Sequence, residues 1–163
     1  DMGGNLQSVL RNNQKKFSGV LNGIDHDYWN PETDSLLPHH YSAHTPEKKG
    51  NVKRELKKRL SLADDNCLLV GAVTRLVSQK GPELIKAALL RTLENGGQFV
   101  LLGSTSDGRT HLTFYTLKGK LAGCAHVHLE LTYNEELSHL VFAGCDLFLV
   151  PSLFEPCGLT QQI

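Results

Sequence analysis

Two cations five residues apart stand in a loop that could bind a diphosphate. Arg75 and Lys80 belong to the segment TRLVSQKG at residues 74–81, between an apolar run and a predicted helix start. A guanidinium can bond two phosphate oxygens at once, an ammonium adds a movable point charge, and a helix N-terminus adds partial positive charge. The GxxxxGKS/T pattern of a P-loop is absent. On the residues alone, diphosphate binding and two ordinary loop cations both remain open.

A second loop, VPSLFEPCGLTQ at residues 150–161, also follows an apolar run. Glu155 can accept hydrogen bonds from sugar hydroxyls, and Gly158 lets the backbone approach a ligand closely. The free amides of the helix expected to open near Thr160 could meet an anion. In the alternative interpretation Glu155 only caps that helix. Cys157 is a poor candidate for a nucleophile, because no histidine or aspartate partner lies near it in the sequence.

Two other groups of residues could carry chemistry. His126 and His128 alternate along a predicted strand and so face the same side, as metal ligands sometimes do. No third ligand is evident, so we expect no metal site. Residues 48–59 hold seven of the seventeen basic residues, a concentration that could contact an anionic partner. A solvated helix face is the expected interpretation of that run.

The secondary structure that positions these loops is predicted from strand and helix patterns that alternate along the sequence. Strands are expected at residues 67–73, 98–102, 126–131 and 146–150. Helices are expected at residues 51–60, from Pro82 to a stop at Asn95, at about 112–121, and from Asn134 onward, with Asn51 and Asn134 as N-caps. This alternation predicts right-handed crossovers and a parallel sheet with helices on both faces, a Rossmann-like α/β fold. Such sheets bind ligands beyond the carboxyl ends of their strands, where both loops should lie.

The first fifty residues do not show this alternation of strand and helix patterns. The short apolar run at residues 17–21 ends at the turn signal Asn22-Gly23 and is predicted to be a strand. Residues 30–50 lack periodicity and contain several prolines, so we expect a long surface connection that is functional or mobile.

Composition excludes several classes of function. The 163 residues carry equal numbers of acidic and basic side chains, which gives no general attraction to nucleic acid or to anionic membranes. No apolar run approaches the roughly 20 residues that span a bilayer. Four cysteines form no CxxC pair, and Cys67 and Cys145 are predicted to be buried thiols in a reducing compartment. Because the chain starts at Asp1 and stops as a helix opens, both ends are expected to be cuts in a longer protein.

Four motifs resemble those of starch and glycogen synthases. NGID at residues 22–25 followed by WNP at 29–31 resembles their NGID…WNP segment, and TRLVSQKG resembles their TRLVPQKG, with Ser78 in place of proline. GGQFVLLGS at residues 96–104 is similar to the plant and algal soluble starch synthases of classes III and IV. VPSLFEPCGLTQ matches the family signature closely. The order and spacing of the motifs agree, and the resemblance covers nearly the whole chain.

The resemblance implies a retaining glucosyltransferase of glycosyltransferase family 5, with two Rossmann-like domains facing across a cleft in the GT-B arrangement. The donor would be ADP-glucose, the acceptor the non-reducing end of an α-1,4-glucan, and no cofactor or metal would be needed. Residues 1–30 would be an interdomain crossover and the first strand of the C-terminal domain, 31–50 a loop, and 51–163 part of the nucleotide-sugar-binding domain. The N-terminal domain would be missing, and the chain by itself inactive.

The resemblance also implies roles for individual residues. Arg75 and Lys80 match the pair that binds the donor phosphates, and Glu155 matches the carboxylate that holds the donor glucose, which makes these three the expected catalytic residues. Tyr133 matches a ring that stacks on adenine, although without the family a core or surface aromatic is the simpler interpretation. Asn22 matches a residue near the donor sugar and the interdomain hinge. The other expected donor-binding positions are Gly103, Cys157, Gly158, Leu159 and Thr160.

Two alternatives remain at this stage. A different retaining GT-B enzyme that uses a UDP-sugar, such as a sucrose synthase, would need the same loops, because diphosphate recognition ignores the base. A non-catalytic fragment could instead bind glucan or a complete synthase. The family implies a plastid location for a plant or algal source and the cytoplasm for a bacterial one; neither nucleic acid nor membrane is an expected partner.

Overall fold

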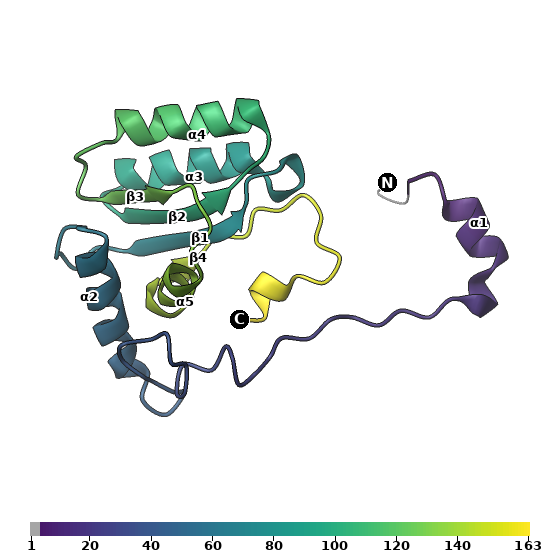
Figure 1. The fold of residues 1–163 in the computed structure, drawn as a ribbon, viewed down its shortest axis with the longest axis horizontal. Coiled ribbons are helices and arrows are strands. Elements are labelled where there is room, and N and C mark those ends of the chain that lie inside the picture. Colours follow the sequence, from purple (N-terminus) through teal and green to yellow (C-terminus); the bar gives the residue numbers. More distant parts are fainter. Residues whose placement is uncertain (1–3) are drawn as a thin grey trace.

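The centre of the molecule is a parallel sheet of four strands, seen in a computed structural model that describes residues 4–163 (Figure 1). The strands lie in the order β3-β2-β1-β4. Their bounds are β1 (Leu69–Arg75), β2 (Gln98–Ser104), β3 (Val127–Glu130) and β4 (Leu147–Phe148). Every pairing between neighbours is parallel, with Val100 of β2 opposite Gly71 of β1 and His128 of β3. The predicted α/β fold class is confirmed.

Helices cover both faces of this sheet, with α3 and α4 on one face and α2 and α5 on the other (Figure 1). The α-helices are α1 (Gln7–Asn12), α2 (Lys49–Arg59), α3 (Pro82–Glu94), α4 (Gly108–Lys120) and α5 (Glu135–Gly144). Single 3-10 turns lie at Gln14–Lys16, Pro46–Lys48, Ser78–Lys80 and Leu159–Gln161. None of these helices, within residues 4–163, is long and apolar enough to cross a membrane.

The caps explain where the helices begin. Pro82 takes the first position of α3, and the Asn134 side chain accepts a hydrogen bond from the Leu137 amide at 3.0 Å, both as predicted. Asn51, the other predicted N-cap, is wrong for that role: it lies inside α2. The chain already turns at Pro46, which suits a first helical position, so the helix starts before Asn51.

Two apolar clusters hold the helices on the sheet, one on each face. Along β2, Val100 and Leu102 join the cluster under α2 and α5, while Phe99 and Leu101 join the cluster under α3 and α4. This alternation buries both faces of β2, and it explains why the strand reads as a continuous apolar run in the sequence. The buried sheet provides a rigid platform from which the loops at its edges project.

Gly71 lies where the end of α5 comes closest to β1. A Cβ at this position would stand 2.5 Å from Cys145 Sγ and 3.0 Å from Val141 Cγ1. We therefore expect Gly71→Ala to lower the free energy of unfolding by about 1–3 kcal/mol, the usual cost of overpacking, as measured by urea denaturation. Gly50→Ala is the control, because a Cβ there meets nothing within 4 Å in α2 and should be neutral or stabilising. A Gly71 variant as stable as the Gly50 variant would contradict this close approach.

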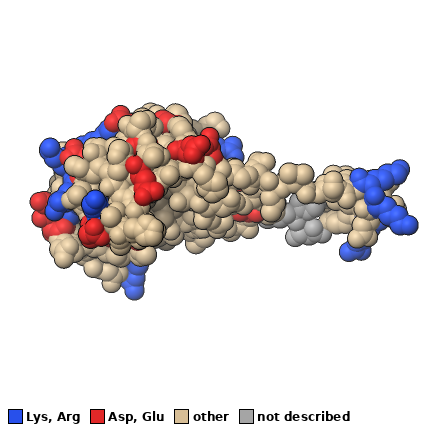
Figure 2. All heavy atoms as spheres, turned by 90° about the horizontal axis from the view of Figure 1, so that it is seen from below, with Lys and Arg blue, Asp and Glu red and all other residues tan. Residues whose placement is uncertain are grey.

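The strand predicted for residues 17–21 is absent. These residues form an extended arm that leads away from the sheet, and Val20 is 92% exposed. Figure 2 shows the same arm as a narrow projection with basic side chains at its far end, where Arg11, Lys15 and Lys16 lie. A strand exists only through hydrogen bonds to a neighbour, and the arm has no such neighbour among residues 4–163.

Residues 31–50, predicted as a surface connection, are packed against α5. The hydroxyl of Tyr41 donates to the Ala143 carbonyl at 3.2 Å, and Asp34 Oδ2 lies 2.5 Å from His139 Nδ1. Both members of the Asp34–His139 pair are buried. The segment is therefore anchored to α5 at these points, while most of its residues are exposed, as expected of a surface connection.

The remaining differences concern element bounds and the cysteines. Helix α4 starts four residues earlier than expected because Asp107 caps it, accepting from the Thr110 amide at 2.8 Å. Strand β4 is only two residues long. Cys145 is buried as predicted, and burial raises the pKa of its thiol to about 12. Cys67 is only partly buried, since it lies in the turn before β1 rather than in the strand.

Candidate functional site

The two loops singled out in the sequence lie against each other at the carboxyl edge of the sheet. The amide of Leu153 donates to the Gln79 carbonyl at 2.9 Å. In return, the side-chain amide of Gln79 donates to the Phe154 carbonyl at 2.8 Å. These bonds join residues 74–81 to residues 150–161, so the predicted convergence of the two loops is confirmed.

A short ion pair stands at this junction. Lys80 Nζ lies 2.5 Å from Glu155 Oε1, and the Ser152 hydroxyl donates to the same oxygen at 2.5 Å. Both charged side chains are 18% exposed. The Lys80 hydrogen bond, then that from Ser152, and the charge of Arg75 hold the pKa of Glu155 below its ordinary value. Glu155 is therefore an ionised carboxylate at neutral pH, able to accept hydrogen bonds but not to donate them.

A pocket of about 290 Å³ opens at the carboxyl ends of β1, β2 and β3 and the start of α5, and neither Lys80 nor Glu155 lines it. Four of the predicted site residues line it, namely Arg75, Gly103, Tyr133 and Thr160. The Tyr133 side chain is largely free, since the residue is 77% exposed, so its ring face can receive a flat aromatic group. The pocket thus combines one cation from Arg75, one carboxylate from Glu135, one exposed ring and largely apolar walls.

The start of α3 adds to the positive potential near Lys80. The helix begins two residues after Lys80, and Gly81 between them has φ +66°. Helix N-termini carry partial positive charge that favours anions. The helix expected to open near Thr160 is only the 3-10 turn Leu159–Gln161, preceded by Gly158 with φ +66°.

None of the remaining predicted residues lines the pocket, Lys80 and Glu155 included. Gly158 is buried, Cys157 is half-buried and Leu159 is partly exposed. Asn22 lies on the extended arm and is not among the lining residues. The structure therefore brings Arg75, Lys80, Glu155 and the positions after Glu155 to one edge of the sheet, and leaves Asn22 apart from them.

Several residues of the site were missed by sequence reasoning. Ser104, the last residue of β2, and Thr132, two residues after β3, line the pocket at a place that the rule for parallel sheets could have indicated. Trp29 lines it too, and its ring stacks on His139 with centroids 4.1 Å apart. The buried contact of His139 with Asp34 had no signal in the sequence, because 105 residues separate the partners.

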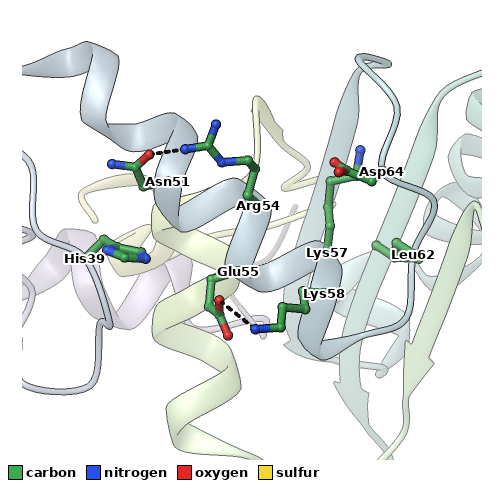
Figure 3. A pocket seen from close by; sticks show the side chains of 8 residues that line it. All are labelled: His39, Asn51, Arg54, Glu55, Lys57, Lys58, Leu62 and Asp64. Carbon is green, nitrogen blue, oxygen red and sulfur yellow. Dashed lines mark hydrogen bonds and ion pairs between the residues drawn. The ribbon is translucent and has the colours of Figure 1, made fainter.

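A larger cavity of about 510 Å³ lies beside α2, away from this site (Figure 3). Its wall mixes charges of both signs, and within it Glu55 pairs with Lys58 while Arg54 donates to the Asn51 side chain. Other basic residues of α2 bind elsewhere in the chain, as in the 2.6 Å contact of Lys53 with Asp146. The basic run at residues 48–59 thus ties α2 to its surroundings, and the cavity presents no converging unpaired charge for an anion.

Comparison with solved structures defines the class of protein. The catalytic domain of starch synthase IV from Arabidopsis thaliana, bound to ADP and acarbose, superposes with a TM-score of 0.92 at 48% identity, covering 96% of this chain and 32% of that one. The C-terminal domain of a glycosyl transferase group 1 family protein from Francisella tularensis gives a TM-score of 0.56 at 15% identity, which shows the fold alone. The fold is that of a GT-B glycosyltransferase domain.

Curated sequences narrow this class to one family. Glycogen synthase of Protochlamydia amoebophila is 47% identical over 171 residues, which cover 99% of this chain and 34% of the relative. Soluble starch synthase 3a of Oryza sativa is 53% identical over 151 residues, covering 91% of the chain and 8% of the relative. No protein-family model matches the chain. The chain belongs to the glycogen and starch synthases, and it spans about a third of the length of the bacterial relative.

Proposed function

We propose that this chain supplies the donor-binding part of an enzyme that transfers glucose, with retention of configuration, from ADP-glucose to the non-reducing end of an α-1,4-glucan. The observation that carries the proposal is the Lys80–Glu155 pair, held 2.5 Å apart at the same carboxyl edge of the sheet as the pocket that Arg75 and Tyr133 line. One cation pair and one carboxylate at a single edge of a parallel sheet suit a diphosphate joined to a hexose. The ADP-bound starch synthase that superposes on the chain supports the nucleotide assignment.

Each group in this arrangement has a chemical task. Arg75 and Lys80 bind the diphosphate, and they stabilise the negative charge that grows on ADP as the glycosidic bond breaks. Glu155, ionised and acceptor-only, binds hydroxyls of the donor glucose. Tyr133 stacks on adenine from the exposed loop after β3. Backbone groups of residues 157–160 complete the contacts to sugar and phosphate.

Two side-chain cations do the electrostatic work here, so the proposed reaction needs no cofactor and no metal. The acceptor glucan would bind across a cleft to a second Rossmann-like domain of the same protein. The location we propose follows the source, the plastid for a plant or alga and the cytoplasm for a bacterium. The names of the rice and Arabidopsis relatives place those proteins in chloroplasts or amyloplasts, which supports the plant half of this proposal.

The choice of donor can be tested in a chimera. This chain would replace the matching third of the Protochlamydia amoebophila glycogen synthase, with the parent enzyme as control. We expect glucan elongation from ADP-glucose, with kcat/KM at least about tenfold above that for UDP-glucose, a difference of about 1.4 kcal/mol in transition-state binding. The chain alone should show no turnover.

Other outcomes would select the alternatives. Preference for UDP-glucose in the chimera would replace the donor assignment by that of a UDP-sugar transferase. A folded but inactive chimera, together with glucan retention by the chain in the absence of nucleotide binding, would favour a non-catalytic glucan-binding role. Nucleotide binding is measured by calorimetric titration of the chain with ADP.

A further inference from the structure

Three side chains with metal-binding chemistry meet at the amino edge of the sheet, opposite the donor pocket. Asp65 and Cys67 lie in the turn before β1, and His126 lies immediately before β3. One ligand atom from each of the three lies within 4.8 Å of the others. Cys67 Sγ is 2.8 Å from Asp65 Oδ1, and His126 Nε2 is 3.6 Å from Asp65 Oδ2. A thiol, an imidazole and a carboxylate thus converge from two separate segments.

These spacings suit a tetrahedral ion. Zinc binds cysteine sulfur at about 2.3 Å, histidine nitrogen at about 2.0–2.1 Å and carboxylate oxygen at about 2.0–2.2 Å, so its ligand atoms lie roughly 3.3–3.6 Å from one another. The 2.8 Å contact of Cys67 Sγ is with Asp65 Oδ1 and the 3.6 Å contact of His126 Nε2 is with Asp65 Oδ2, so the side chains must rotate to bring one carboxylate oxygen to that spacing from both the sulfur and the imidazole. Side-chain rotations alone can adjust them, because the backbone already places the three residues together.

The segments that carry the three residues are firmly joined. The Ala63 amide donates to the Ala125 carbonyl at 2.7 Å, and the buried Gln98 side chain donates to the Ala63 carbonyl at 2.8 Å. The His126 carbonyl in turn accepts from the Phe99 amide at 3.0 Å. The cluster is therefore built on the ends of the sheet, where geometry is held more tightly than in a free loop.

Two lysines of α2 support the turn from behind. Lys57 is only 3% exposed, and its ammonium donates to the Asp65 carbonyl at 2.6 Å and to Asp65 Oδ1 at 3.2 Å. This contact leaves Oδ2 directed toward His126. Lys53 donates to the Cys67 carbonyl at 3.0 Å. Hydrogen bonds that fix the orientation of a ligating side chain in this way are the usual support of protein metal sites.

We propose that Asp65, Cys67 and His126 bind one thiophilic divalent ion such as Zn²⁺, with water as the fourth ligand. All three residues are partly open to solvent, which provides an entry path and room for that water. The Cys67 thiol gives its proton to solvent as its sulfur binds the ion. The site links the turns that precede β1 and β3 and takes no part in glucose transfer. His128, paired with His126 in the sequence analysis, is not a member of the cluster.

A spectroscopic titration tests the proposal directly. Co²⁺ added to the purified protein should produce a thiolate-to-metal charge-transfer band that saturates at one ion per chain. The band should be lost in Cys67→Ser and kept in Cys124→Ser and Cys157→Ser. His126→Gln and Asp65→Asn should weaken apparent Co²⁺ affinity at least about tenfold. His128→Gln is the matched control and should bind as the parent does.

A second measurement needs no variant. Bound Zn²⁺ should protect Cys67 from alkylation by iodoacetamide, followed by peptide mass spectrometry, while the exposed Cys124 is modified at an unchanged rate. Zn²⁺ should also raise the thermal midpoint of the parent protein but not that of Cys67→Ser. The proposal is overturned by a charge-transfer band that persists in Cys67→Ser, by the absence of any band, or by equal alkylation of Cys67 with and without Zn²⁺.

Discussion

Replacing Lys80 by alanine should lower kcat for glucose transfer from ADP-glucose by about 10²–10³-fold in the glycogen synthase chimera that carries this chain. In the proposed reaction the ammonium is one of two cations that stabilise the charge developing on the leaving ADP, and loss of one such group costs about 2.7–4 kcal/mol in comparable sites. Lys80 also holds Glu155 at 2.5 Å, so its removal frees the carboxylate from its position. Initial rates at saturating ADP-glucose measure the effect.

The pH profile of the same variant distinguishes a lost cation from a damaged fold. Lys80 is the largest cause of the lowered pKa of Glu155, so the pKa should rise toward its ordinary value in Lys80→Ala. A function that needs ionised Glu155 is lost as pH falls through that pKa, so the acid limb of the rate should move to higher pH. Lys86→Ala, which removes an ammonium from the same stretch of chain, should leave both rate and profile unchanged. Full activity in Lys80→Ala would refute the phosphate role.

Gly81→Ala should damage the site without removing any functional group. Gly81 has φ +66°, and a Cβ there would stand 2.5 Å from the Pro151 carbonyl oxygen. Left-handed strain of about 1–2 kcal/mol and the clash of about 1–3 kcal/mol together predict a loss of about 2–5 kcal/mol in the free energy of unfolding. Because the loops at residues 74–81 and 150–161 would separate, kcat in the chimera should fall about 10²-fold.

Gly96→Ala is the matched control for this prediction. Gly96 also has positive φ, at +73°, but a Cβ there meets nothing within 4 Å. It should therefore show the strain alone, about 1–2 kcal/mol by chemical denaturation, with unchanged kcat. If the two alanine variants lost the same stability and the same activity, the contact between Gly81 and Pro151 would have no part in holding the site together.

The parts of the fold that sequence reasoning found are those with local signals. Strand β2 reads as an apolar run because both of its faces are buried, and α5 begins where Asn134 can cap it. The convergence of Lys80 with Glu155 was predictable because parallel strands direct their carboxyl ends to one edge. That rule requires only the order of strands and helices along the chain, which the spacing of apolar residues predicts.

What sequence reasoning missed depends on partners distant in the chain. Apolar residues 17–21 have strand composition, but composition cannot say whether a neighbouring strand is present. The buried contact of Asp34 with His139 turns a proline-rich segment into packed structure, and nothing in its local sequence signals that contact. The Asp65–Cys67–His126 cluster has no local signal either, because His126 is distant in the chain from the other two residues and the strand period of two pairs it with His128 instead.

The contact between Lys80 and Glu155 means that the proposed phosphate site carries its own counter-ion. An incoming diphosphate must exchange places with the carboxylate, which weakens its net attraction to the ammonium. An intact sugar nucleotide compensates, because its hexose offers hydroxyl donors to the displaced Glu155. ADP left after transfer no longer carries the hexose, so the carboxylate competes to return to Lys80 and favours departure of the product. The resting ion pair would then bias the site toward substrate over spent nucleotide without any moving lid.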